Sequence, residues 1–368
     1  KGVVIGIADD GVDLAHTEFV GQAVDDLHFN FTTGKADGNP VASDQGHGTI
    51  VAGLALARAN NGRGIAGVAP GARLASLVVW TPKDEFGSEE EIADMFQYRN
   101  DRIAVQNHSW GSSTSAQLDA AALEKQAIKQ AIEKGRNGKG VVMIRVSGNE
   151  RARNWSAADD GYSNDPRVLT VGTVGLVGRV LNFSNMGACV LCAGLISKGV
   201  YSTDRMSALG WNRESSDDDP EVGSYYALKH LGNSYTLPQI AGLVALILSA
   251  NPDLTYRDVQ QVIIHASRHY DFADPFLQSN ASGYPFSLNT GYGVPDAGAA
   301  VRLAKRWTNV RPLVEKSYKQ TSVVPVPDDG LRLQIFANGK NSAFAASPGD
   351  GLVADDSIEP LPLVDVGR

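Results

Sequence analysis

Short apolar runs alternate along most of the chain with longer stretches in which apolar residues recur every third or fourth position. The short runs are rich in valine, isoleucine and leucine, and they predict strands at residues 3–8, 74–79, 103–107, 140–146 and 168–171. The longer stretches predict helices at residues 47–58, 88–98, 116–134, 234–250, 256–266 and 297–306. This alternation is typical of an α/β fold of three layers, with helices on both faces of a mainly parallel central sheet.

The pattern changes after Trp307. Residues 310–327 contain three prolines and no helical period, residues 331–336 predict one strand, and the remainder is rich in turns. This part of the chain is too short to bury a large second core. We therefore predict a main domain at residues 1–308, followed at residues 309–368 by a linker and a partial, β-rich C-terminal segment.

Composition and charge narrow the classes of function. An apolar content of 43% and a charged content of 20% describe an ordinary globular protein. The net charge of -8 and the scattered lysines and arginines disfavour nucleic-acid binding, which needs clustered cations. No run of 18 apolar residues occurs, so we predict no membrane-spanning helix.

The two cysteines, Cys189 and Cys192, are three positions apart. In an extended strand they point to opposite faces, which obstructs a local disulfide. Free buried thiols are therefore predicted. A redox or metal-binding role is the alternative, but no second cysteine pair supports it.

Three polar residues stand where chemistry is often placed. Asp9 ends the first predicted strand, as catalytic residues of open α/β sheets do, although a simple turn explains it equally well. His47 stands between two glycines at a helix start, where another chain can approach closely, although a lone histidine is more often structural. Ser234 begins a buried helix whose dipole favours developing negative charge, although an N-cap serine is the commoner explanation.

In chain order these residues are Asp, His and Ser, which is one of the known orders of a serine protease triad. The sequence resembles the subtilase family of serine endopeptidases through four ordered motifs. They are Asp-Asp-Gly-Val-Asp from residue 9, His-Gly-Thr-Ile-Val-Ala-Gly from residue 47, Ser-Gly-Asn from residue 147 and Gly-Asn-Ser-Tyr-Thr-Leu-Pro from residue 232. It looks closest to the kexin and furin branch of proprotein convertases and their bacterial relatives, for example through Asn-His-Ser-Trp-Gly from residue 107.

The similarity spans residues 2 to about 310, and the N-terminal edge of the family's domain is expected to precede Lys1. The resemblance implies a subtilisin-like fold with Asp9, His47 and Ser234 as catalytic triad. It also implies that the side-chain amide of Asn149 completes an oxyanion hole, although an asparagine after Ser-Gly is also typical of an ordinary turn. The expected reaction is peptide hydrolysis through an acyl-enzyme.

The resemblance further implies a preference for basic residues before the cleaved bond. Asp10 and Asp44 fall where they would face a basic residue next to the cleaved one, and Asp160 falls where the family's primary pocket carries an aspartate. Solvated loop acids are the alternative. An acidic pair that the family carries after Ser-Trp-Gly is replaced here by Ser-Ser-Thr-Ser at residues 112–115, so strict dibasic specificity is not expected. The substrate-binding residues implied by the resemblance are Asp10, Asp44, Ser109, Trp110, Gly111 and Asp160.

A structural calcium ion is also implied. Asn61 belongs to a loop that resembles the family's calcium loop, and Glu18 stands where a carboxylate ligand is expected. A further acidic ligand would precede Lys1, and an ordinary Asn-Asn-Gly turn is the alternative. The resemblance also implies polypeptide substrates, a monomer, and a secreted protein or one of the periplasm or secretory pathway.

Two positions depart from the family's motif at the serine, since Asn233 replaces a threonine and Thr236 replaces an alanine. Neither removes a catalytic group, but the hydroxyl of Thr236 could hinder acylation. An inactive subtilase fold that serves as a protein-binding module is therefore the rival hypothesis. A nucleotide-dependent enzyme is disfavoured because the glycine-rich stretch at residues 135–140 leads into a strand rather than a helix.

Overall fold

The computed structural model describes residues 2–80, 83, 85–111, 118–216, 222–228, 232–311, 331–337 and 340–346. The chain divides into two compact units, Lys1–Asn309 and Val310–Arg368. In the second unit, β14 (Leu331–Ala337) pairs antiparallel with β15 (Lys340–Ala346). The strand predicted at residues 331–336 is therefore confirmed, and its hairpin partner was not predicted.

The first unit is built on a seven-stranded sheet with the order β2-β3-β1-β4-β5-β6-β7, in which all neighbouring strands run parallel. The strands are β1 (Val4–Asp9), β2 (Phe29–Asn30), β3 (Arg73–Val78), β4 (Ile103–His108), β5 (Val142–Val146), β6 (Leu169–Val174) and β7 (Val190–Leu195). The five predicted strands are all present. The prediction missed β2, which is very short, and β7, whose Cys-Ala-Gly sequence has little β-propensity.

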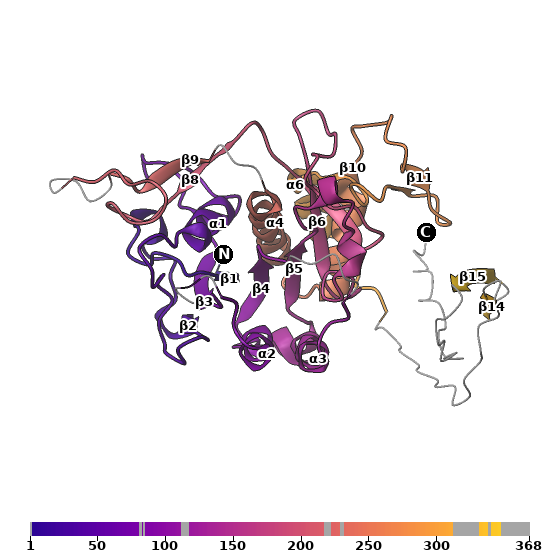
Figure 1. The fold of residues 1–368 in the computed structure, drawn as a ribbon, viewed down its shortest axis with the longest axis horizontal. Coiled ribbons are helices and arrows are strands. Elements are labelled where there is room, and N and C mark those ends of the chain that lie inside the picture. Colours follow the sequence, from indigo (N-terminus) through magenta and orange to yellow (C-terminus); the bar gives the residue numbers. More distant parts are fainter. Residues whose placement is uncertain are drawn as a thin grey trace. The chain divides into compact units, whose positions relative to one another are not determined.

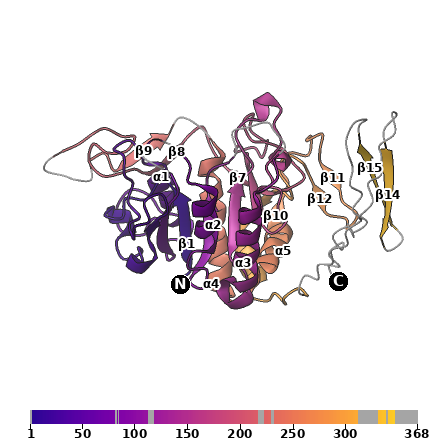
Figure 2. The same cartoon turned by 60° about the horizontal axis from the view of Figure 1, so that its bottom comes forward.

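Within the described ranges six α-helices surround the sheet, one for each predicted helix. They are α1 (His47–Leu56), α2 (Glu89–Gln97), α3 (Ala122–Gly138), α4 (Leu237–Ala250), α5 (Tyr256–Ala266) and α6 (Ala297–Ala304). Helices α1 and α4 lie on one face of the sheet and α2 and α3 on the other (Figures 1 and 2). The three-layer α/β architecture is therefore confirmed, with α3 and α4 beginning later than predicted.

The remaining elements are short. The 3₁₀ turns are η1 (Thr17–Phe19), η2 (Asp25–Leu27), η3 (Arg151–Arg153), η4 (Ala157–Asp159) and η5 (Asn233–Tyr235). The minor strands are β8 (Val200–Thr203), β9 (Tyr225–Leu228), β10 (Ser267–Arg268), β11 (Gln278–Ser279), β12 (Pro285–Phe286) and β13 (Val294–Pro295). Among the residues described, no helix has both the length and the apolar character needed to cross a membrane.

The ends of several strands and the starts of two helices, one of them the buried helix α4, meet at one edge of the sheet. The sequence of α4 is apolar on almost every side, and the helix is buried against α1, β4 and β5. Because β1, β4 and β5 run parallel, their carboxyl ends meet at the same edge of the sheet. The starts of α1 and α4 lie at that edge too, so it is where a site is expected.

Both cysteines are free, as predicted. Cys192 lies buried in β7, and Cys189 is half-buried just before that strand. Burial raises the pKa of Cys189 to about 12, and it raises the pKa of Cys192 further above the usual range. Both thiols therefore stay protonated at neutral pH, which makes them poor nucleophiles.

Candidate active site

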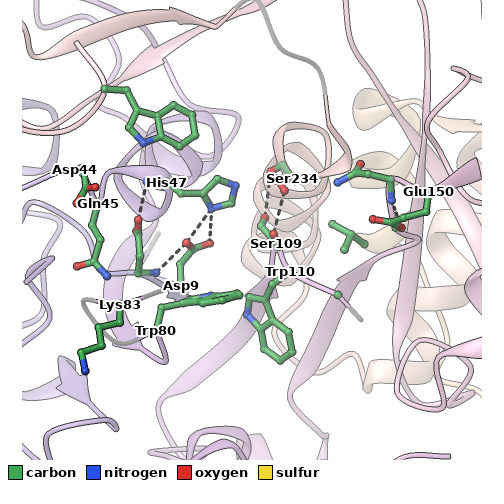
Figure 3. A pocket seen from close by; sticks show the side chains of 16 residues that line it. Asp9, Asp44, Gln45, His47, Trp80, Lys83, Ser109, Trp110, Glu150 and Ser234 are labelled. Atoms are coloured by element: carbon green, nitrogen blue, oxygen red, sulfur yellow. Dashed lines mark hydrogen bonds and ion pairs between the residues drawn. The ribbon is translucent and has the colours of Figure 1, made fainter. Parts of the chain in front are cut away.

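Asp9 and His47 meet between the end of β1 and the start of α1. Nδ1 of His47 lies 2.8 Å from Oδ1 and 3.0 Å from Oδ2 of Asp9 (Figure 3). The carboxylate is 2% exposed. A Cβ atom at Gly48 would lie 2.4 Å from the Gly11 carbonyl oxygen and 3.0 Å from Cβ of Asp9. The glycine after His47 is therefore needed for this close approach.

The Asp10 carboxylate accepts hydrogen bonds from the backbone at the start of the same helix. Its Oδ2 accepts the N–H groups of Gly46 (2.9 Å) and His47 (3.0 Å), and its Oδ1 accepts that of Gly48 (2.7 Å). Burial and the neighbouring Asp9 charge raise the pKa of Asp10 to about 7. Asp10 borders the cleft, but both carboxylate oxygens bind the helix backbone. The carboxylate thus satisfies unpaired helix N–H groups, and its contact with a basic substrate residue stays a prediction.

Ser234 lies in η5, just before α4 begins. Its Oγ donates to the carbonyl oxygen of Ser109 at 3.0 Å, and the Ser109 hydroxyl donates to the Ser234 carbonyl at 3.1 Å. This reciprocal pair fixes η5 against the segment that follows β4. Figure 3 shows Ser234 on the side of the His47 ring that faces α4, with Asp9 beneath the ring.

Asn149 follows β5 through Gly148, which has a φ of +101°. A Cβ atom at Gly148 would lie 2.3 Å from the Asn185 side chain, so glycine is required there. Oδ1 of Asn149 accepts the backbone N–H of Asn233 at 2.9 Å. Its amide NH₂ is therefore left as a donor beside the turn that carries Ser234.

All four predicted catalytic side chains line one cleft of about 640 Å³. The cleft is lined by Asp9, Asp10, Asp44, Gln45, His47, Trp80, Lys83, Ser109, Trp110, Gly111, Val146, Gly148, Asn149, Glu150, Trp211 and Ser234. It combines a carboxylate-bound imidazole, a serine hydroxyl and a side-chain amide. Such a set is suited to nucleophilic attack on a carbonyl group.

Comparison with known proteins identifies the family. The model of the subtilase family matches residues 1–293. The chain belongs to the subtilase family. The identification as a member of this family of serine peptidases is therefore confirmed.

Among curated relatives, proprotein convertase subtilisin/kexin type 4 of Mus musculus is 31% identical over 319 residues, which are 85% of this subtilase and 46% of that protein. Furin of Mus musculus is 29% identical over 91% of this chain and 41% of its own. The dibasic-processing endoprotease of Yarrowia lipolytica is 31% identical over 84% of this chain and 31% of its own. The resemblance to the kexin and furin branch is confirmed, and the chain spans less than half the length of these relatives.

Solved structures confirm the subtilisin-like fold. The serine protease of Aeromonas sobria, solved in complex with a chaperone, superposes with a TM-score of 0.78 at 21% identity and covers 92% of this subtilase and 67% of its own chain. Fervidolysin from Fervidobacterium pennivorans, a keratinolytic enzyme related to subtilisin, superposes with a TM-score of 0.66 at 22% identity. The match covers 96% of this chain and 49% of the fervidolysin chain.

The two departures from the subtilase motif form a buried network that the sequence did not predict. Asn233 and Thr236 are both fully buried. The hydroxyl of Thr236 lies 2.7 Å from that of Thr173 in β6 and donates to the Asn233 carbonyl at 3.1 Å, and Thr173 donates to the Asn233 side chain. The Asn233 amide donates to Ser147 Oγ at 2.9 Å. The added hydroxyl therefore has partners inside the core and does not enter the cleft.

The predicted substrate-binding residues fall into two groups. Ser109, Trp110, Gly111 and the exposed Asp44 line the cleft of this subtilase. Asp160 instead lines a smaller neighbouring cavity, and its Oδ2 accepts Nη2 of Arg145 at 2.6 Å. The Ser-Ser-Thr-Ser segment at residues 112–115 lies outside the described residues.

The predicted calcium ligands are brought together, but with hydrogen-bond donors rather than oxygen ligands around them. Glu18 is fully buried, and its Oε2 accepts Nδ2 of Asn61 at 2.7 Å. Its Oε1 accepts the Tyr225 hydroxyl at 2.9 Å and the N–H of Ile65 at 3.3 Å. Calcium requires six to eight oxygen ligands. Within the described part of the chain no group of three His, Cys, Asp or Glu side chains could hold a metal ion. As arranged, these residues do not fit calcium.

Proposed function

We propose that this subtilase is a serine endopeptidase that hydrolyses peptide bonds through an acyl-enzyme. The observation that carries the proposal is the bonding of His47 to Asp9 in the cleft that also contains Ser234 and Asn149. Membership of the subtilase family supports it. Ser234 is the nucleophile, His47 the general base and acid, and Asp9 the residue that holds the imidazole.

The first half of the reaction forms the acyl-enzyme. As Oγ of Ser234 attacks the substrate carbonyl carbon, Nε2 of His47 takes the hydroxyl proton. Asp9, bonded to Nδ1, keeps the proton on that nitrogen and stabilises the imidazolium that forms. His47 then gives its proton to the leaving amine. In the second half a water molecule attacks the ester by the same route.

The proposed mechanism requires one side-chain rotation before the first step. Ser234 Oγ donates to the Ser109 carbonyl, so the hydroxyl must rotate toward His47 before it can lose its proton. Contacts between a nucleophile and its base are often loose until substrate binds. We propose that an extended substrate, by occupying the cleft, aligns them.

The oxyanion formed in each half carries negative charge outside the triad. The amide NH₂ of Asn149 and the backbone N–H of Ser234, at a turn leading into α4, are the donors that we assign to it. The bond from Asn233 N–H to Oδ1 of Asn149 orients this amide, since it fixes which end of the amide is the donor.

The substrates that we propose are polypeptides. The exposed carboxylate of Asp44 supports a basic residue at the subsite it borders, next to the residue that precedes the cleaved bond. Family membership also supports a monomeric enzyme that is secreted or resides in the periplasm or secretory pathway.

The proposal is tested by covalent labelling and peptide cleavage. A fluorophosphonate probe is expected to label the wild type, and a library of extended peptides is expected to be cut. Ser234→Ala should abolish both, because it removes the nucleophile. Ser279→Ala, which removes an exposed hydroxyl on β11 outside the cleft, should change neither. A folded wild type that is neither labelled nor active would contradict the proposal and favour a binding module.

A further inference from the structure

Arg145 is a buried cation next to the cleft. It lies in β5 beside Val146, which lines the cleft, yet its own side chain is only 5% exposed. The guanidinium carbon is 4.5 Å from the centroid of the Trp110 ring and 4.3 Å from that of Tyr162. Its Nε donates to Ser163 Oγ at 3.2 Å. The guanidinium thus lies against two aromatic rings and is almost fully shielded from solvent.

The partner of this cation is Asp160, and every oxygen of that carboxylate is engaged. Oδ2 accepts Nη2 of Arg145 at 2.6 Å. Oδ1 accepts the backbone N–H groups of Tyr162 (2.9 Å) and Ser163 (3.2 Å). Burial alone would raise the pKa of Asp160, but the Arg145 charge and these hydrogen bonds outweigh it and hold the pKa below its usual range. The two charges therefore form a closed, neutral pair.

Asp160 lines a cavity that adjoins the cleft. The cavity shares Gly111, Val146 and Gly148 with the cleft, and Gly148 directly precedes Asn149 in the chain. Its free volume is about 20 Å³, so it must widen to receive the side chain that precedes the cleaved bond, with Asp160 in its lining. A second carboxylate, that of Asp159, also lines the cavity, but its Oδ2 accepts the N–H of Ser156 and caps η4.

We propose that Arg145 sets the specificity of this cavity. By neutralising Asp160, it makes the pocket select an uncharged side chain immediately before the cleaved bond, instead of lysine or arginine. This inference rests on the proposed peptidase function and assigns its substrate class. Arg145 acts through Asp160 and does not touch the substrate, so it is a positioning residue.

The physical reason is the balance between the cost of removing water from a charged substrate side chain and the gain from pairing that side chain with a carboxylate. A lysine or arginine side chain that enters the cavity must lose its water. An unpaired carboxylate would compensate for that loss, but a carboxylate already bonded to a guanidinium attracts a second cation only weakly. An uncharged side chain has no such desolvation cost, so it is the better ligand for a neutral pocket.

The test compares two quenched peptides that differ only in arginine or methionine before the cleaved bond. For the wild type, kcat/KM for methionine is expected to equal or exceed that for arginine. In Arg145→Gln the ratio of arginine to methionine should rise by about tenfold or more, because Asp160 is no longer neutralised. The double variant with Asp160→Asn should lose this gain. Arg102→Gln removes a surface guanidinium paired with Asp26 and should keep the wild-type ratio.

Each result decides the proposal. A wild type that prefers arginine by tenfold or more overturns it, as does an active Arg145→Gln variant with an unchanged ratio. A gain that survives in the double variant assigns the charge to Asp159 and overturns the role of Asp160. If Arg145→Gln does not fold, the proposal is decided on the wild type alone. The measurement is then the rate of its inactivation by chloromethyl ketones that end in arginine or in methionine. Loss of all cleavage and labelling in the wild type contradicts the peptidase function instead.

Discussion

Nδ1 of His47 lies 2.8 Å from Oδ1 of Asp9, across the junction between β1 and α1. Asp9 is buried and His47 is partly exposed, so the carboxylate holds the inner edge of the ring while the outer edge remains toward the cleft. This orientation leaves Nε2 to exchange protons with Ser234 and substrate.

Asp9→Asn is therefore expected to reduce kcat strongly without removing the fold. An asparagine can still bond to the ring, but it favours the wrong tautomer and cannot stabilise the imidazolium. Serine proteases with this triad lose about 10⁴-fold in kcat from the equivalent change. Steady-state cleavage of a peptide substrate measures it, with circular dichroism as the control for folding. A loss of less than tenfold would argue against this role for Asp9.

Asn149→Ala is expected to slow the reaction while leaving substrate affinity nearly unchanged. The amide contacts the oxyanion, which exists only after attack, so its loss lowers kcat rather than raising KM. The expected reduction is about 10²–10³-fold, a size known from subtilisin itself. Asn185→Ala is not a suitable control, because Asn185 holds the same loop through Glu150. Asn280→Ala, in a turn outside the cleft, is the matched control. An unchanged kcat with a raised KM would contradict the assignment.

Much of the site could be predicted because its geometry follows from chain order and strand direction. Asp9 ends a strand, His47 starts α1 and Ser234 lies in the turn before α4, so a parallel sheet brings them to one edge. The glycine-flanked motifs then specify the close approach. Local sequence also specifies the start of α5, where Thr255 and Asp258 form a capping box.

Other features depend on side-chain directions that sequence patterns do not contain. The bonds from the Asp10 carboxylate to the N–H groups at the start of α1 had no signal in the sequence pattern. Arg145 stands in an otherwise apolar strand, and only the fold shows that its guanidinium reaches Asp160 across 15 positions. The partnership of Thr173 with Thr236 crosses between β6 and the start of α4 and has no local signal.

The raised pKa of Asp10 predicts that the folded protein becomes less stable as pH rises from acid to neutral. In the unfolded chain the group ionises near 3.8, while burial and the Asp9 charge raise its folded pKa to about 7. Below both values the two states bind the proton equally. Between them the folded state alone keeps the proton, so the free energy of unfolding falls as pH rises through this window.

Urea unfolding of the Ser234→Ala variant at several pH values from 4 to 8 measures this effect, roughly the window between the two pKa values. Adding Asp10→Asn should flatten the fall, because the titrating group is gone. It should also lower stability throughout, since an amide cannot accept all three backbone N–H groups that the carboxylate accepts. An equally steep fall in Asp10→Asn would assign the pH dependence to other groups.

The bonding of Glu18 predicts that calcium does not stabilise the main domain through Glu18 and Asn61. The Asn61 amide, the Tyr225 hydroxyl and the Ile65 N–H already direct three hydrogens at this buried carboxylate. A calcium ion would have to displace them and find several further oxygen ligands. We therefore expect the same Tm in excess chelator and in millimolar calcium.

The hydroxyl of Tyr225 is the part of this arrangement that a single substitution can remove. Tyr225→Phe leaves one oxygen of the buried carboxylate with a weaker partner set, so it should cost about 1–3 kcal/mol in the free energy of unfolding. Tyr201→Phe is the matched control, because Tyr201 stacks on Tyr225 from β8 but is 53% exposed. If calcium instead raised the Tm of the wild type by several degrees and Tyr225→Phe cost nothing, Glu18 would be a metal ligand whose hydrogen bonds give way to the ion.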